Sequence, residues 1–385
     1  MKKTALIFGA GKTGRGFAAH LAFLGGYDII LIDKNRQLVA ELKKAGHYDI
    51  QILGNEEMSC TIHLSGVHHI EDVSWHDEFA KTSLIFTSVF GNNLETLAEN
   101  LAVALQKRYM ENPKQVLSIM TCENLTNAAQ FLKKMVIKKW GEEKEKWLSE
   151  LVGFSESIVF KTCLEASAEQ SPLTIRGQNF FELPCDGDAI KEELYVYGLK
   201  PMTNFKDQLR RKIYTYNCIN AVITYLGAIK GYTQLYEAGN DAEILATARK
   251  AGNETCLAQV AEFGFDRKEQ DEWMNAAFAK FADKNIPDPI ERNGADPKRK
   301  LGRDDRLIGP ALLALKHNIY PEGLIAGIIA CFHYRDPNKD STIADIIRDK
   351  NAEFVLKEIC GLSPHEELFM VIKEQIIKSN MNGKN

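Results

Sequence analysis

The chain has 385 residues, of which 45% are hydrophobic and 26% are charged. This is the balance of an ordinary globular protein, and it excludes wholesale disorder and collagen-like structure. At about 150 residues per domain, the length favours two domains. The 48 Lys and Arg residues against 52 Asp and Glu residues give a net charge of −4, which argues against a protein that coats nucleic acid.

The sequence predicts a protein of a reducing compartment with no membrane segment. No apolar run approaches the roughly 20 residues that cross a bilayer, and the apolar start MKKTALIF continues into glycine and lysine without a cleavage-like tail. The eight cysteines have no CxxC or zinc-ligand spacing, which is typical of scattered reduced thiols. We therefore expect a cytoplasmic protein, a monomer or small homo-oligomer, without nucleic-acid, membrane or metal partners.

The first 125 residues alternate between strand-like and helix-like segments. Four continuous apolar runs are typical of buried strands: Thr4–Phe8, Tyr27–Asp33, Ser83–Val89 and Val116–Cys122. Less regular strands are expected at 47–53, 60–64, 151–159 and 173–176, and a helix at Phe17–Leu24. Apolar strands with helices between them predict an α/β fold with a Rossmann-type, doubly wound parallel sheet.

From about Pro201 onward the pattern is helical. Few β-branched runs occur, and helical periodicity covers 208–225, 242–263, 269–281, 307–315, 323–332, 341–349 and 366–379. We expect the boundary within Pro184–Pro201 and predict two domains, a nucleotide-binding domain at 1–195 and a mostly α-helical substrate and catalytic domain at 196–385.

A glycine-rich motif follows the first predicted strand. Gly9-Ala10-Gly11-Lys12-Thr13-Gly14 matches GxGxxG and opens a helix. The first glycine permits the tight turn, the second lets the backbone approach a pyrophosphate, and the third lets helix and strand pack closely. The motif therefore predicts a dinucleotide that lies across the switch point of the sheet.

Asp33 ends the second predicted strand, where a carboxylate accepts hydrogen bonds from the adenosine ribose. Because this charge repels a 2′-phosphate, NAD is favoured over NADP as the cofactor. Gly11-Lys12-Thr13 also looks like the end of a P-loop, but Leu6 stands where that motif requires glycine. A glycine turn that binds no ligand is the remaining alternative.

Lys212, Asn217 and Asn220 lie in one predicted helix of the second domain. Relative to Lys212, Asn220 lies at about 80° and Asn217 at about 140° around an α-helix, so the three share one broad face. On this pattern alone, a solvated helix surface is the simpler interpretation.

Several motifs occur in order along the chain: Phe8–Phe17, Cys122-Glu123-Asn124, Lys212-x4-Asn217 with Tyr225-Leu-Gly227, Ile290-Glu-Arg, Arg299-Lys-Leu, Asp305-Arg-Leu-Ile308 and His333-Tyr-Arg335. Together they resemble the mannitol dehydrogenase family, the polyol-specific long-chain dehydrogenases, and especially its branch that acts on mannitol 1-phosphate.

The resemblance implies an NAD-dependent oxidoreductase that transfers hydride without zinc. Lys212 would be the general base, and Asn124 and Asn217 would donate to the substrate oxygen, with Asn220 beside them. It also implies that Phe8, Arg15, Val89 and Asn124 join the cofactor-binding residues of the glycine-rich loop. The substrate pair that it favours is mannitol 1-phosphate and fructose 6-phosphate.

Three positions depart from the family pattern. Asn220 stands where the family has histidine, and Phe160 stands where it has aspartate. Val89-Phe90-Gly91 differs from the small-residue junction of the family. A related hexuronate reductase and a nucleotide-binding protein that has lost catalysis therefore remain alternatives.

Positive charge is dense between Arg299 and Arg306. Arg299, Lys300 and Arg306 are predicted to bind a substrate phosphate, for which Arg supplies bidentate hydrogen bonds. A solvated charged loop before the helix at Leu307 is the alternative.

Overall fold

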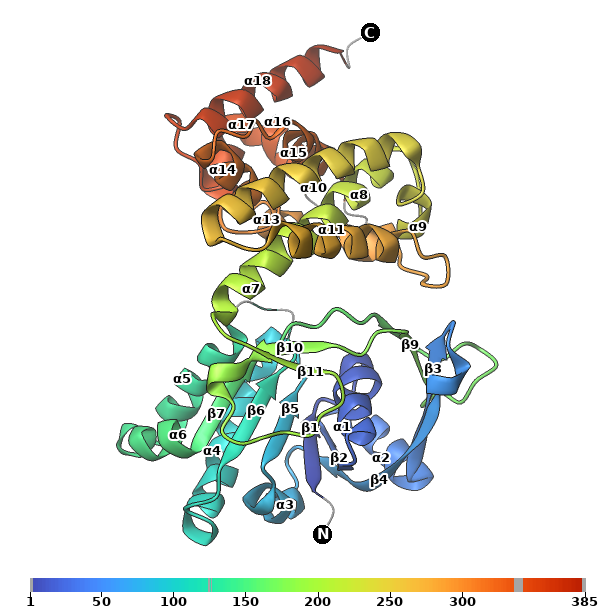
Figure 1. The fold of residues 1–385 in the computed structure, drawn as a ribbon, viewed down its shortest axis with the longest axis vertical. Helices are drawn as coiled ribbons and strands as arrows, with labels where there is room; N and C mark the ends of the chain where they lie inside the picture. The colour runs from blue at the N-terminus through green and yellow to red at the C-terminus, as the bar shows by residue number, and fades with distance from the viewer. Residues whose placement is uncertain (1–2, 124, 126, 336–341, 383–385) are drawn as a thin grey trace. The chain divides into compact units, whose positions relative to one another are not determined.

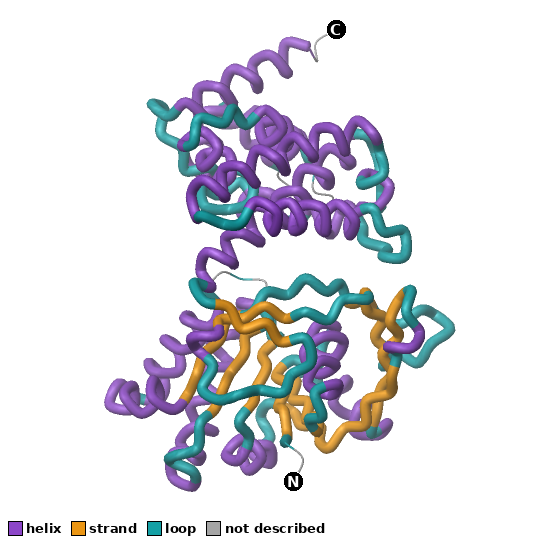
Figure 2. Tube along the Cα trace, in the orientation of Figure 1, coloured by secondary structure: helices purple, strands orange, loops and turns teal. Residues whose placement is uncertain are grey.

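The structure, a computed structural model, describes residues 3–123, 125, 127–335 and 342–382. Its contacts divide the chain into two compact units, Met1–Lys206 and Asp207–Asn385. Strands concentrate in the first unit and helices make up the second (Figure 2).

A nine-stranded sheet organises the first unit (Figure 1). Its order is β7-β6-β5-β1-β2-β4-β3-β9-β8, and the six strands from β7 to β4 are mutually parallel. β3 is antiparallel to β4 and parallel to β9, which β8 joins in antiparallel pairing. The strands are β1 (Thr4–Phe8), β2 (Asp28–Asp33), β3 (His47–Leu53), β4 (Cys60–His69), β5 (Leu84–Thr87), β6 (Leu117–Thr121), β7 (Val152–Glu156), β8 (Cys163–Leu164) and β9 (Ile175–Gln178).

This order confirms the predicted Rossmann-type, doubly wound architecture, because strand order reverses at β1, between β2 on one side and β5 on the other. The helices of this unit are α1 (His20–Leu24), α2 (Arg36–Ala45), α3 (His76–Lys81), α4 (Leu94–Glu111), α5 (Ala128–Trp140) and α6 (Glu145–Leu151). A π-helical turn, Gly14–Ala19, precedes α1, and short 3₁₀ turns cover 56–58, 73–75, 91–93, 142–144 and 187–189.

Alternate residues of β1 enter two different hydrophobic cores. Ala5 and Ile7 belong to one cluster, whereas Leu6 and Phe8 belong to the other, and all four are fully buried. A strand buried on both faces needs a continuous apolar run, which is why the sequence pattern identified it.

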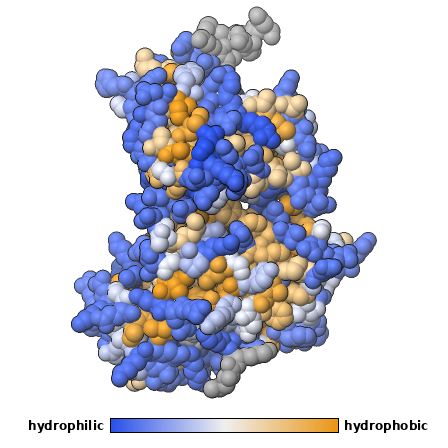
Figure 3. Space-filling view, in the orientation of Figure 1, coloured by the Kyte–Doolittle hydropathy of each residue, from blue (hydrophilic) through white to orange (hydrophobic). Residues whose placement is uncertain are grey.

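Polar residues cover much of the surface in the space-filling view, with apolar patches between them (Figure 3).

The first unit extends to Lys206 because of a small second sheet. β10 (Leu183–Asp186) pairs in parallel with β11 (Leu199–Met202). Because β11 pairs with β10, it belongs to the first unit, which ends at Lys206. The boundary expected from the sequence lies earlier, between residues 195 and 196.

The second unit is mostly helical, as predicted. Its helices are α7 (Phe205–Lys212), which starts just before the division, α8 (Cys218–Ile229), α9 (Leu235–Ala238), α10 (Ala242–Phe263), α11 (Arg267–Phe281), α12 (Ile290–Gly294), α13 (Pro297–Lys300), α14 (Ile308–Lys316), α15 (Glu322–His333), α16 (Ile343–Lys350), α17 (Ala352–Phe354) and α18 (Glu367–Asn382). Two π-helical turns, Ile213–Asn217 and Val355–Ile359, lie beside α8 and α17.

Local signals fix the ends of α10. The Asp241 side chain accepts hydrogen bonds from the amides of Glu243 and Ile244, and Gly264 adopts the left-handed conformation at the other end. An acidic N-cap and a glycine C-cap are strong boundary signals. The predicted and observed ranges of this helix therefore coincide.

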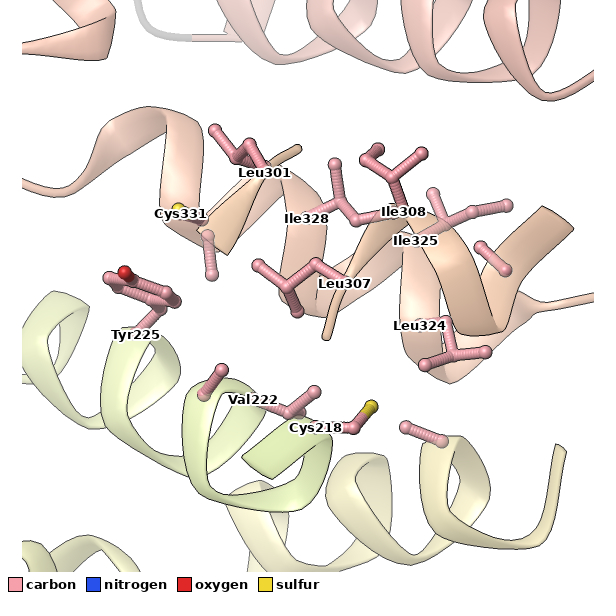
Figure 4. Packing of buried hydrophobic residues seen from close by; sticks show 14 of the residues in the cluster. Cys218, Val222, Tyr225, Leu301, Leu307, Ile308, Leu324, Ile325, Ile328 and Cys331 are labelled. Atoms are coloured by element: carbon pink, nitrogen blue, oxygen red, sulfur yellow. The ribbon is translucent and has the colours of Figure 1, made fainter. Parts of the chain in front are cut away.

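The core of the second unit lies around α8. Figure 4 shows Cys218 and Val222 of α8 facing Leu307 and Leu324, with Tyr225 near Cys331. Within the described residues, no helix is both long and apolar enough for a membrane span.

Candidate active site and its relatives

The glycine-rich loop joins β1 to the π-helical turn that precedes α1. Gly9 has a φ of 95°, and a Cβ there would lie 2.2 Å from the Ser88 carbonyl oxygen. A Cβ on Gly14 would lie 1.8 Å from the Gly9 oxygen. A side chain at either position is therefore excluded by the backbone itself.

Gly11 differs, because a Cβ at this position would meet nothing within 4 Å. The residue is exposed and its φ is not positive, so neither the conformation nor the packing of the protein requires glycine here. A glycine that the protein itself does not need leaves space for a ligand to approach the backbone closely, as a pyrophosphate does in Rossmann domains. The loop thus fits the dinucleotide that the motif predicts.

Asp33 lies at the carboxyl end of β2, beside the loop. Its Oδ2 accepts a hydrogen bond from the Ala10 amide at 2.6 Å, and its Oδ1 accepts one from the Asn35 amide at 2.7 Å. An ionised carboxylate has about four acceptor positions, so it has capacity for a ribose diol as well. These two amides hold the carboxylate in place at the end of the strand.

Two other predicted cofactor residues, Arg15 and Phe8, support the glycine-rich loop through buried side chains. The Arg15 side chain is 3% exposed and donates from Nε to the Ala10 oxygen at 2.7 Å and from a terminal nitrogen to the Leu173 oxygen. Phe8 is fully buried against Trp75. Lys12 is exposed and lies 3.6 Å from Glu165, while Thr13 is half-buried. Arg15 and Phe8 therefore support the loop with their side chains.

Glu123 joins the carboxyl ends of β5 and β6. One carboxylate oxygen accepts from the Val89 amide at 3.1 Å, and the other accepts from the Thr87 hydroxyl at 2.9 Å. Burial raises the pKa of Glu123. The predicted cofactor position Val89 is thus fixed through its backbone. Asn124, predicted to bind both cofactor and substrate, lies outside the described residues.

In the second unit, Lys212 ends α7 and immediately precedes the π-helical turn Ile213–Asn217. The Cys218 amide donates to the Ile213 oxygen, five residues earlier. A π-turn holds one residue more than an α-turn, so Asn217 is rotated toward the face of Lys212 relative to the 140° expected of an α-helix. No local pattern in the sequence predicted this turn.

Lys212 is buried, with 8% of its surface exposed. The pKa of its amine is lowered to about 7, first by burial and then by the positive charges of Arg306 and Lys280. Asp305 acts in the opposite direction. A lysine in this environment is readily neutral near physiological pH, as a general base must be.

The predicted phosphate-binding cations belong to the same electrostatic neighbourhood. Arg306 and Arg299 lower the pKa of both Lys212 and Lys300. Lys300 is 5% exposed, and burial is the main cause that brings its pKa to about 7. Its amine donates to the Asn293 carbonyl oxygen.

Carboxylates hold the two arginines. Arg306 Nε lies 2.7 Å from Asp305 Oδ1, and Arg299 Nε lies 2.8 Å from Asp296 Oδ2. The segment Arg299–Arg306 therefore combines buried cations with anchored guanidinium groups, unlike a freely solvated loop.

Asn217 and Asn220 are half-buried. Asn220 Nδ2 donates to Asn293 Oδ1 at 3.2 Å, and Asn293 Nδ2 donates in turn to Asp288 Oδ1 at 2.6 Å. Sequence reasoning missed Asn293, Asp288 and Lys280, because their relation to the helix of Lys212 depends on tertiary packing. The one sequence signal was the proximity of Asn293 to the Ile290-Glu-Arg motif.

Among the residues that the structure describes, no three His, Cys, Asp or Glu side chains form a group suited to a metal ion. All eight cysteines are free thiols.

Family comparisons cover both units. Residues 3–195 match the mannitol dehydrogenase Rossmann domain, and residues 204–379 match the mannitol dehydrogenase C-terminal domain. The chain is 31% identical over 377 residues to mannitol-1-phosphate 5-dehydrogenase of Bacillus subtilis (strain 168), covering 97% of this chain and 99% of that protein.

Solved structures share the fold at low sequence identity. Pseudomonas fluorescens mannitol 2-dehydrogenase, in ternary complex with NAD and D-mannitol, has a TM-score of 0.77 at 14% identity. The superposition covers 100% of this chain and 92% of that enzyme's chain. A D-sorbitol dehydrogenase in substrate-free form has a TM-score of 0.74 at 15% identity, and the superposition covers 92% of this chain and 86% of that enzyme's chain. With both of its domains matched and a relative 31% identical over 97% of its length, the chain belongs to the mannitol dehydrogenase family and is an NAD-binding oxidoreductase.

Proposed function

We propose that this protein interconverts a polyol phosphate and a ketose phosphate, with mannitol 1-phosphate and fructose 6-phosphate as the favoured pair. Lys212 is the general base, and the reaction needs no zinc. The observation that carries the proposal is a buried lysine whose pKa is lowered to about 7 by burial and by positive charges that include Arg306 and Arg299. The same two arginines also lower the pKa of Lys300. The Bacillus subtilis relative, named for mannitol 1-phosphate, supports the substrate.

In the oxidation direction, neutral Lys212 accepts the proton of the substrate hydroxyl at Nζ. Asn217 and Asn220 donate amide hydrogen bonds to the same oxygen as negative charge develops on it. Asn293 orients the Asn220 amide through the contact at 3.2 Å. NAD, when bound, supplies the hydride acceptor.

Arg306, Arg299 and Lys300 bind the phosphate group. Anchoring of both arginines by aspartates limits the side-chain entropy lost on binding. A phosphate beside Lys300 would favour the charged form of its amine and so strengthen the contact. The same cations suit the carboxylate of a hexuronate, which keeps that reductase as the second candidate.

The rate of alcohol oxidation is expected to rise with pH below about 7 and to level off above it, because Lys212 accepts a proton only when it is neutral. Ketose reduction is expected to show the opposite dependence, because it needs the protonated amine. The measurement is kcat in both directions between pH 5.5 and 9.

Lys300 is the control for the pH profile, because its pKa is also about 7. Lys300→Met should raise KM for the phosphorylated substrate and retain the rising limb of kcat. If kcat of the Lys300 variant no longer rose with pH while kcat of the wild type still did, the pH dependence would belong to Lys300 and not to Lys212.

The substrate is tested by NADH absorbance with mannitol 1-phosphate, free mannitol and hexuronates, in buffer containing EDTA. We expect the phosphorylated polyol to be preferred and EDTA to leave the rate unchanged. Arg306→Gln should lower kcat/KM for the phosphorylated polyol by about 10- to 100-fold, the effect of losing a charged hydrogen bond. The exposed Arg348→Gln is the matched control. Equal rates with free mannitol would contradict phosphate recognition, and faster reaction of a hexuronate would favour the second candidate.

A further inference from the structure

Phe90, which lies just before the 3₁₀ turn that follows β5, combines two unfavourable features. Its backbone has φ 64° and ψ 148°, and its side chain is 80% exposed. L-residues rarely adopt this conformation, which is essentially restricted to glycine. Among the described residues, the other non-glycine residues of positive φ are all Asn or Asp, which tolerate it better: Asn127, Asn204, Asp296, Asn318 and Asn351. Phe90 is therefore the exceptional residue of this set.

Polar contacts hold the chain on both sides of Phe90. The Asn93 amide donates to the Phe90 oxygen at 3.0 Å, and Asn93 Nδ2 donates to the Val89 oxygen at 2.5 Å. The Val89 amide is held in turn by the buried carboxylate of Glu123. The surrounding structure thus fixes the strained conformation, which is the arrangement expected when strain is retained for a function.

The position of Phe90 relative to the glycine-rich loop indicates that function. A Cβ on Gly9 would lie 2.2 Å from the Ser88 oxygen, so the segment that leads to Phe90 touches this loop. On the other side, a Cβ on Gly91 would lie 3.0 Å from Cδ2 of Leu125, which follows β6. Phe90 therefore lies along the carboxyl edge of the sheet between the loops that follow β1 and β6.

The order of the strands distinguishes the two halves of the dinucleotide. Asp33, the ribose partner expected for the adenosine half, ends β2 on one side of β1. β5 and β6 lie on the other side, where the second mononucleotide-binding half of a Rossmann sheet takes the nicotinamide half. Phe90 belongs to this second side.

We propose that Phe90 packs its ring against the nicotinamide mononucleotide half of bound NAD, and that its strained backbone is retained for this contact. An exposed ring gains by covering a ribose or nicotinamide face on binding. This role is independent of the polyol substrate and rests only on NAD binding.

The test separates backbone strain from ring contact. Phe90→Gly is expected to raise the Tm of the ligand-free protein, because glycine adopts a positive φ without penalty. It is expected to raise Kd for NADH, measured by nicotinamide fluorescence, by about tenfold. Kd for ADP, measured by calorimetry, should change less than twofold because this probe lacks both the nicotinamide and its ribose.

Two further variants control for loop flexibility and for loss of an exposed ring. Phe90→Tyr keeps the ring and should retain wild-type affinity for NADH. Phe131→Ala removes a partly exposed phenylalanine of α5 and should alter neither Kd. Unchanged NADH affinity in Phe90→Gly, or an equal weakening of ADP binding, would overturn the contact. A lower Tm of Phe90→Gly would contradict the proposal that the Phe90 backbone is strained. No measurement involves a polyol, so these outcomes are independent of the proposed substrate.

Discussion

Replacing Lys212 with methionine is expected to lower kcat for polyol phosphate oxidation by about 10³-fold, within the range that general-base catalysis contributes. Methionine fills a similar volume in the buried position and accepts no proton there. The residual rate should lose the pH dependence near 7 that we propose for the lysine. Stopped-flow measurement of NADH formation at saturating substrate gives both quantities.

The matched control is Lys284→Met, which removes an exposed lysine from a loop of the same unit. NADH fluorescence titration should give wild-type affinity for both variants, because Lys212 is proposed to act on the substrate hydroxyl. A Lys212 variant with kcat within a few fold of wild type would remove the lysine from the mechanism. A weakened NADH affinity with unchanged kcat would assign it to cofactor binding instead.

Gly11→Val is the second change with a large expected effect. Its side chain points into space that is open in the protein, so the Tm of the ligand-free protein should stay close to that of wild type. The same side chain would occupy the volume through which we expect the pyrophosphate to approach the backbone. We expect NADH affinity to fall by about 100-fold, equivalent to about 2.7 kcal/mol.

Gly14→Ala provides the contrast to Gly11→Val. Its Cβ would lie 1.8 Å from the Gly9 oxygen, so this substitution should lower Tm before any ligand is added. Calorimetric Tm and NADH titration of the two variants therefore separate structural glycines from the ligand-facing one. If Gly11→Val retained full NADH affinity, the dinucleotide would not lie against this part of the loop.

Local patterns predicted much of the fold because the elements carry their own signals. β1 is apolar on both faces, and the caps of α10 mark both of its ends. The order of β3, β9 and β8 at the edge of the sheet was not predictable, because it depends on pairing between distant segments. The first unit likewise extends to Lys206 through the pairing of β11, which no local signal marks.

The candidate site was predictable where a motif or a charge run defined it. Gly11 and Asp33 follow from the Rossmann pattern, and Arg306 follows from the dense positive charge. The π-helical turn after Lys212 was not predictable, because its hydrogen bonds depend on the packing of the whole helix. The contribution of Lys280 to the lowered pKa of Lys212 was also not predictable, because the two lysines lie on separate helices.

The pairing of β9 with β3 constrains how the nascent chain completes its first unit. β3 is synthesised early, yet one of its edges pairs with Ile175–Gln178. Until that segment leaves the ribosome, the edge of β3 presents unpaired backbone groups to other chains, a known route to aggregation. An expression fragment that stops after β7 would keep this edge permanently, so a stable isolated cofactor domain must include the segments up to β11.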